Sequence, residues 1–224
     1  MIAIGLLLFA GSAKAIIFGQ IDDFEDGSLQ NWANGGAPGA PPVLNIDTGG
    51  PAGVGDNFME VTAVGSGPGQ FLTVFNRSQW LGNYLATGVT AIEMDLRNLG
   101  KVDLTIRLGF KDAAEPGASG YLSQGFTLAA GGDWQHVIFL IDPATMTAVG
   151  SPDAFNTFFA DGLQEARIIN ELGASSLYGD AVTGQLGVDN IHAVPEPSTI
   201  LLAGVGLLAF IAARRRVASR TFPS

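Results

Sequence analysis

The chain contains no cysteine and only two histidines among its 224 residues. The absence of cysteine excludes disulfide bonds, thiolate nucleophiles and every metal site that depends on cysteine. Two histidines are too few for a multi-histidine zinc site. Charged residues are also scarce, at 14% of the chain, against about 25% in an average globular protein. Hydrophobic residues make up 47%, so the chain can still bury a core.

Long hydrophobic runs occur near both ends of the chain. Residues 2–13 are almost wholly apolar, and Ala13-Lys14-Ala15 has the small-x-small pattern that precedes a signal peptidase cut. This pattern predicts a signal peptide over residues 1–15. No lysine or arginine precedes the run, so either the coded start lies upstream of Met1 or the free amino terminus supplies the positive charge. A buried N-terminal strand or helix is the alternative.

The second apolar run, Ile200–Ala213, follows Pro195-Glu196-Pro197 and is closed by Arg214, Arg215 and Arg216. A helix of this run is about 21 Å long, which is shorter than the hydrocarbon core of about 30 Å. The predicted transmembrane helix over 198–213 therefore needs bilayer thinning or arginine snorkelling. The positive-inside rule puts the basic tail 214–224 in the cytoplasm and residues 16–197 outside, in agreement with an export signal.

This order of parts resembles the PEP-CTERM sorting signal of exported Gram-negative bacterial proteins. The resemblance covers residues 195–224 and implies an exosortase as processing partner, a membrane-embedded enzyme that recognises and removes the segment. It implies a precursor anchored in the bacterial inner membrane, and then a protein of the cell surface or extracellular matrix. A permanent single-span anchor with a proline hinge is the alternative.

The remaining domain, 16–194, is strongly acidic. It holds six basic and twenty acidic residues, a net charge of −14. This charge excludes nucleic acid as a partner, because the phosphates of DNA and RNA would be repelled. The same charge predicts that a polysaccharide ligand is uncharged or cationic.

Alternating polar and apolar residues predict an all-β domain. Residues 92–97 and 102–110 alternate strictly, which indicates two half-buried strands with a turn at 98–101. A short helix is expected over 154–163. Further candidate strands are 18–25, 43–47, 58–64, 70–76, 121–128, 134–141, 165–169 and 185–193. About ten strands separated by Gly-rich and Pro-rich loops are typical of an antiparallel β-sandwich, here a jelly roll followed by the C-terminal transmembrane helix.

The opening segment IDDFEDG (21–27), the central GDWQHV (132–137) and the closing GVDNI (187–191) resemble galactose-binding-like jelly rolls. That superfamily includes many carbohydrate-binding modules. The resemblance implies that the first and last strands pair and that acids there hold a structural calcium ion. The candidate calcium ligands are Glu25, Asp189, Asp23 and Asp47. Calcium takes six to eight oxygen ligands, and solvated turn carboxylates are the alternative.

Aromatic and polar residues gather at 76–84 (NRSQWLGNY). Such a mixture stacks on sugar rings and bonds their hydroxyls, so the predicted carbohydrate-binding residues are Trp80, Tyr84, Arg77 and Asn83. The alternative is that both aromatic rings pack at the edge of the sandwich and bond the backbone with their polar atoms.

No catalytic constellation is visible. No Gly-x-Ser-x-Gly elbow frames a serine, and twenty acids guarantee that carboxylate pairs exist, so the pairs alone do not indicate a glycosidase. The sequence therefore predicts a non-catalytic surface or matrix protein, with exopolysaccharide as its candidate ligand. A secreted hydrolase acting on polysaccharide is the alternative.

Overall fold

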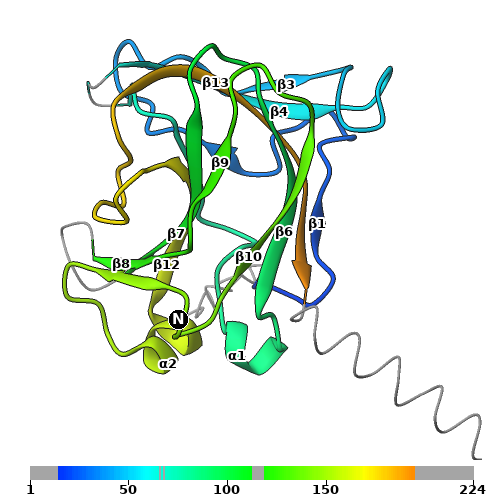
Figure 1. Ribbon diagram of the computed structural model, residues 1–224. Coiled ribbons are helices and arrows are strands. Elements are labelled where there is room, and N and C mark those ends of the chain that lie inside the picture. The colour runs from blue at the N-terminus through cyan, green and yellow to red at the C-terminus, as the bar shows by residue number, and fades with distance from the viewer. Residues whose placement is uncertain (1–14, 66, 68, 113–118, 195–224) are drawn as a thin grey trace, which may run out of the picture.

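Two antiparallel β-sheets face each other and enclose the main hydrophobic core (Figure 1). The computed structural model describes residues 15–65, 67, 69–112 and 119–194. The predicted signal peptide up to residue 14 lies outside the described residues, as do the Pro195–Pro197 motif, the predicted transmembrane helix and the three arginines. Among the residues that are described, no helix has the length and apolar character needed to cross a membrane.

The first sheet has the strand order β10-β6-β13-β4-β3, and β1 also pairs with β13. Its strands are β1 (Ile21–Asp22), β3 (Leu44–Ile46), β4 (Phe58–Gly65), β6 (Ala91–Asn98), β10 (Gln135–Leu140) and β13 (Val182–Val194). Every pairing is antiparallel.

The second sheet has the order β11-β8-β7-β12-β5-β2, and β9 also pairs with β7. Its strands are β2 (Trp32–Ala33), β5 (Thr73–Asn76), β7 (Leu104–Asp112), β8 (Gly120–Leu122), β9 (Phe126–Leu128), β11 (Thr147–Val149) and β12 (Leu163–Asn170). The prediction of an all-β antiparallel sandwich is thereby confirmed.

The core follows from the period-two pattern of the strands. In β7, the side chains of Leu104, Ile106, Leu108 and Phe110 are buried between the sheets, while the intervening residues face outward. Each such side chain contributes about 1.5–3 kcal/mol when it is removed from water. The expected helix at 154–163 is present as α2 (Phe155–Thr157) and a single π-helical turn, η1 (Phe158–Gly162), which close one end of the sandwich with phenylalanines.

Both ends of the domain meet at one place. The N–H of Gly19 donates to the carbonyl of Ala193 at 2.9 Å, and Ile21 pairs with His192. The expected pairing of first and last strands is thus confirmed. Ile17 and Phe18, just before this junction, are exposed.

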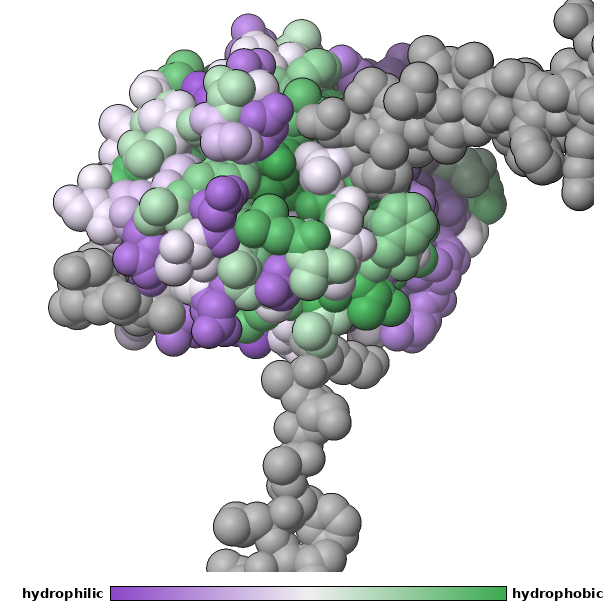
Figure 2. Space-filling model, turned by 90° about the horizontal axis from the view of Figure 1, so that it is seen from below, coloured by the Kyte–Doolittle hydropathy of each residue, from purple (hydrophilic) through white to green (hydrophobic). Residues whose placement is uncertain are grey.

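Figure 2 shows the end of the sandwich that carries α1 (Tyr84–Thr87) and α2, where hydrophobic residues gather toward the middle of the surface.

The two alternating segments at 92–97 and 102–110 do form strands, but they do not form a hairpin. They become β6 and β7, which lie in different sheets. The buried side chain of Asn98 donates to the carbonyls of Val102 and Leu128, at 2.8 and 3.1 Å, so it fixes the chain where it crosses between the sheets. Alternation predicts the two faces of a strand, but it carries no information about the partner strand.

Candidate functional site

Trp80 and Tyr84 are completely buried, so the prediction that they stack on a sugar ring is wrong. The indole N–H of Trp80 donates to Asp22 Oδ2 at 2.6 Å, and the hydroxyl of Tyr84 donates to the carbonyl of Trp80 at 2.8 Å. Asn83 is exposed, but its side chain caps α1 by accepting from the N–H of Ala86. These three residues stabilise the fold.

Asp22 explains why the tryptophans point inward. Its carboxylate is 4% exposed and accepts hydrogen bonds from the indoles of Trp32 and Trp80 and from the amide of Gln79. Burial raises the pKa of Asp22, and the three donors oppose that rise. The alternative, in which both rings pack in the sandwich, is the one that the structure shows. The acceptor of the Trp80 indole lies more than fifty residues away, so the local sequence gives no sign of it.

Arg77, the fourth predicted residue, does lie in a groove. The groove has a volume of about 330 Å³ and runs over the outer face of the second sheet. Its position follows from the strand register, because Arg167 of β12 pairs with Phe75 of β5 and with Gly109 of β7. The side chains lining it include Phe71, Thr73, Phe75, Arg77, Lys111, Arg167 and Tyr178.

Two arginines in this groove share one carboxylate. The Nε of Arg77 donates to Glu165 at 2.5 Å, and the guanidinium carbon of Arg77 lies 4.2 Å from the centre of the Phe75 ring. Arg167 pairs with the same carboxylate and also donates to the carbonyl of Leu177. Glu165 is 2% exposed, so its burial depends on these two positive partners.

Lys111 adds a third cation to the lining. It is half-buried and lies opposite Glu165 in the strand register, and its ammonium group forms no ion pair or hydrogen bond with any described residue. The groove therefore brings three cationic side chains around one carboxylate.

The loop 171–181 forms one wall of the groove. Leu177 packs on Leu122, Val149 and Ile169, on the outer side of the second sheet. The adjacent Tyr178 is 51% exposed, and its ring centre lies 5.6 Å from the guanidinium carbon of Arg167. The loop thus holds an aromatic ring at the open side of the groove.

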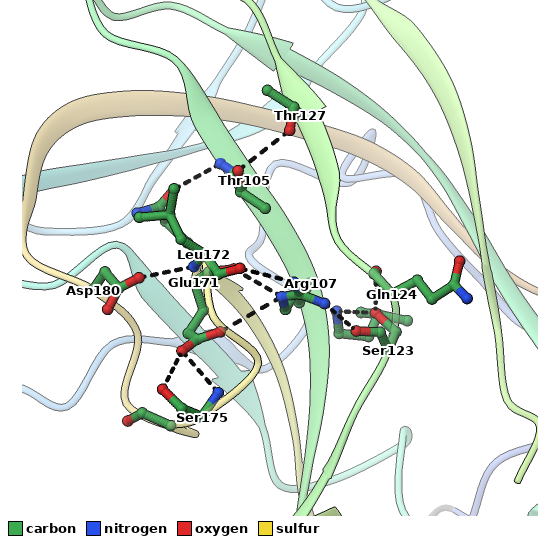
Figure 3. A network of polar contacts seen from close by, with 12 residues as sticks. Thr105, Arg107, Ser123, Gln124, Thr127, Glu171, Leu172, Ser175 and Asp180 are labelled. Atoms are coloured by element: carbon green, nitrogen blue, oxygen red, sulfur yellow. Dashed lines mark hydrogen bonds and ion pairs between the residues drawn. The ribbon is translucent and has the colours of Figure 1, made fainter. Parts of the chain in front are cut away.

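Arg107 fastens this loop to the sheet (Figure 3). Its guanidinium donates to the carbonyls of Glu171 and Ser123, both at 2.8 Å, and of Leu172 at 3.1 Å. The carboxylate of Glu171 is fully buried and accepts from the N–H and the hydroxyl of Ser175. Neither Arg107 nor Tyr178 was found by sequence reasoning, because a single arginine in a strand and a single tyrosine in a loop are common.

The predicted calcium ligands do not form one cluster. Within the described ranges, no three histidine or acidic side chains are grouped so that they could hold a metal ion. Asp189 is 1% exposed, and its pKa is raised to about 7, chiefly by burial and further by the negative charges of Asp56, Asp95 and Glu25. Glu25 is therefore near Asp189, whereas neither Asp23 nor Asp47 is among the charges that act on it.

The two histidines lie on the outer face of the first sheet. His136 Nδ1 is 3.0 Å from Asp95 Oδ1, and His192 Nδ1 is 2.9 Å from Glu93 Oε1. Both contacts join side chains of neighbouring strands in the first sheet, and neither brings a histidine to a serine or threonine hydroxyl.

The sandwich is similar in structure to carbohydrate-binding modules. A family 11 carbohydrate-binding module from Clostridium thermocellum, solved with a β-1,3-1,4-mixed-linked tetrasaccharide, has a TM-score of 0.52 and 16% identity, over 80% of this chain and 96% of that chain. The family 11 module of a cellulosomal cellulase of Clostridium thermocellum has a TM-score of 0.52 and 16% identity, over 80% and 95%. These likenesses show the fold alone.

An exo-β-agarase is also similar, with a TM-score of 0.51 and 11% identity over 80% of this chain. The likeness covers 25% of the agarase chain, so it concerns one part of that enzyme. No curated protein matches this chain in sequence.

The C-terminal segment matches a family model. Residues 193–216 match the PEP-CTERM protein-sorting motif, and this range contains the Pro195–Pro197 motif, the apolar run and the three arginines. The motif implies an exported protein that an exosortase sorts to the cell surface. The chain thus combines a PEP-CTERM sorting motif with an antiparallel β-sandwich of the kind found in carbohydrate-binding modules.

Proposed function

We propose that this is a non-catalytic, exported carbohydrate-binding protein and that the groove on the second sheet holds part of a polysaccharide chain. The observation that carries the proposal is the exposed ring of Tyr178 at a groove whose other lining residues combine aromatic rings with hydrogen-bond donors. An aromatic ring offers a flat apolar surface to the C–H face of a sugar, and the donors bind its hydroxyls. The fold shared with carbohydrate-binding modules supports the same function.

Binding is favoured over hydrolysis by the lining of the groove. A glycosidase of the common type needs two carboxyl groups about 5–9.5 Å apart across the sugar. None of the described side chains that line this groove is a carboxylate. The neighbouring Glu165 already pairs with two arginines.

A Tyr178→Ala variant tests the proposal. The exposed ring supports sugar stacking more than the fold, so the variant should lose about fivefold or more in affinity, on the scale of what an aromatic side chain contributes when it stacks on a nucleobase, about 1–3 kcal/mol. Leu172→Ala is the matched control, because Leu172 is an exposed apolar residue of the same loop whose contacts to Arg107 and Asp180 use its backbone. Affinity electrophoresis against a polysaccharide panel gives the measurement. Equal binding by both variants would remove the site from this groove.

For localisation, we propose a precursor held in the inner membrane of a Gram-negative bacterium by residues 198–213, which an exosortase cuts near Pro195–Pro197. The order of motif, apolar run and arginines supports this, together with the match over 193–216. Mass spectrometry of the surface-exposed protein should then find a C-terminus near this motif. Recovery of mature chains that all end at Ser224 would instead identify a permanent anchor.

A calcium ion held by Glu25 and Asp189 is a further part of the proposal. Asp189 is buried beside other carboxylates and has no ion-pair partner among the described residues, and a cation with oxygen ligands would relieve that repulsion. A ligand at a hundredfold excess over its Kd stabilises the native state by about 2.7 kcal/mol. The melting temperature of a domain of this size rises by about 2–4 °C for each kcal/mol. Identical melting temperatures in calcium and in EDTA would exclude the ion.

A further inference from the structure

The cations of this acidic domain are concentrated on one face. Of its six basic residues, Arg77, Arg107, Lys111 and Arg167 lie on or beside the outward-facing rows of the second sheet. Arg107 is occupied by the loop carbonyls, and the other three line the groove. Half of the positive charge of a domain with a net charge of −14 therefore lies in this one groove.

The charges close to the groove determine the sign of its local field. At physiological ionic strength the Debye length is about 8 Å, so exposed charges elsewhere on the domain are largely screened from a ligand in the groove. Among the described side chains at the groove, the three cations of the lining and the carboxylate of Glu165 sum to two positive charges. The expectation of an uncharged or cationic ligand comes from the net charge of the whole domain. The charge of the groove itself acts on a ligand there, so that expectation does not apply to this site.

From this geometry we infer that the groove takes an acidic polysaccharide, one whose sugar units carry carboxylates. The inference rests on the proposed function and names the class of sugar for the same groove. Three cations gathered in one groove repel one another, and Glu165 pairs with only two of them. A carboxylate of the ligand supplies the missing negative charge, which a neutral glucan cannot do.

The donors required for this recognition are present. The Nε of Arg77 is bonded to Glu165, and its two terminal nitrogens have no hydrogen-bond partner in the described part of the chain. The terminal nitrogens of a guanidinium form a planar fork that binds a carboxylate through two parallel bonds. The packing of Arg77 on Phe75 and its bond to Glu165 hold that fork in place. Lys111 supplies a second, point-like positive charge.

The size of the groove limits how many charges are recognised. A volume of about 330 Å³ is at the lower end of the range of ligand pockets, about 300–1,000 Å³. Such a groove holds one or two sugar units of a longer chain. We therefore assign it to a polymer that presents a carboxylate at intervals, since the negative surface outside the groove repels a chain as densely charged as a nucleic acid.

The test measures binding of the full chain to pairs of polysaccharides that differ in charge. The domain 16–194 contains the groove that should bind them. The probes are polygalacturonate, alginate, hyaluronate and xanthan, each beside its carboxyl-reduced form, which keeps the backbone and loses the charge, together with neutral β-glucan and agarose. We expect an acidic polymer to bind and its reduced form to bind at least about tenfold more weakly, as hydrogen bonds to charged groups allow. Equal binding of both forms, or binding of neutral polymers alone, would overturn the inference and leave the proposed function standing. No binding to any probe would overturn both.

A lysine pair provides the matched variants. Lys111→Gln should weaken binding of the acidic polymer by about tenfold and leave its reduced form unaffected. Lys101→Gln makes the same change in net charge at an exposed lysine outside this groove, so it should bind like the unaltered protein. Arg77→Gln is a second test, because Arg167 still neutralises Glu165 in that variant. Melting temperatures verify that each variant folds. If Lys111→Gln and Lys101→Gln bind alike, the groove does not recognise a charge.

Discussion

Burial separates the aromatic residues of this domain into two kinds with opposite expected behaviour. Trp80 is completely buried and donates to Asp22, whereas Tyr178 is 51% exposed beside the groove. Trp80→Ala should therefore lower the free energy of unfolding by about 3–5 kcal/mol, the usual cost of a large cavity. For a domain of this size the melting temperature falls by about 2–4 °C per kcal/mol. Thermal unfolding followed by circular dichroism measures both variants. A Trp80→Ala protein that melts like Tyr178→Ala would contradict the burial of Trp80.

Asp189 carries the clearest prediction about pH. Burial raises its pKa to about 7 from the ordinary value of 3.8. Between these values the native state keeps a proton that the unfolded state releases, so the free energy of unfolding decreases as the pH rises through this window. In EDTA, urea denaturation at pH 4.5 and pH 8 should show this decrease. In Asp189→Asn the side chain does not titrate, so the decrease should be smaller. An unchanged pH dependence in that variant would assign the effect to other groups.

At the scale of elements, the strands could be predicted much better than their partners. The alternation at 92–97 and 102–110 identified β6 and β7 because each strand has one buried and one outer face. It could not identify their sheets, since the crossing depends on bonds from Asn98 to carbonyls elsewhere. The two-residue β2 and the three-residue β11 were missed because such short strands leave no periodic pattern.

The loop 171–181 is the element on which the groove most depends. Arg107→Lys keeps the charge but cannot reproduce all the bonds to the carbonyls of Ser123, Glu171 and Leu172. Each lost bond from a charged donor costs about 1.5–3 kcal/mol. We therefore expect faster amide hydrogen exchange in the loop and weaker sugar binding, because Tyr178 is no longer held.

Arg97→Lys is the control for this change. Arg97 also donates its Nε to a carbonyl, that of Gly132 at 3.2 Å, but it lies in β6 of the other sheet. Its variant should leave exchange in residues 171–181 unchanged. Equal exchange in the loop of both variants would show that Arg107 does not hold it.

At the scale of the whole molecule, the candidate site could be predicted only in part. Residues 76–84 are contiguous in sequence, so they suggest one cluster, yet the fold buries Trp80 and leaves Arg77 outside. Arg77 pairs with Glu165, and it lines the groove together with Arg167 and Tyr178. These three residues come from segments about ninety to a hundred residues away. Such a site depends on sheet register, which a single sequence does not specify.

The acidic surface and the cationic groove together predict an unusual dependence on salt. The Debye length is about 30 Å at 0.01 M, about 10 Å at 0.1 M and about 3 Å at 1 M ionic strength. At the lowest salt, the net charge of −14 over the domain repels an acidic polymer before it reaches the groove. At about 0.1 M this repulsion is screened, while the contacts with Arg77 and Lys111 act at short range and persist. At 1 M those contacts weaken as well.

Affinity for an acidic polymer should therefore pass through a maximum at intermediate salt, whereas affinity for its carboxyl-reduced form should be nearly flat. Calorimetric titration across this range makes the measurement, and a steady fall from the lowest salt would show that the groove alone sets the field felt by the ligand.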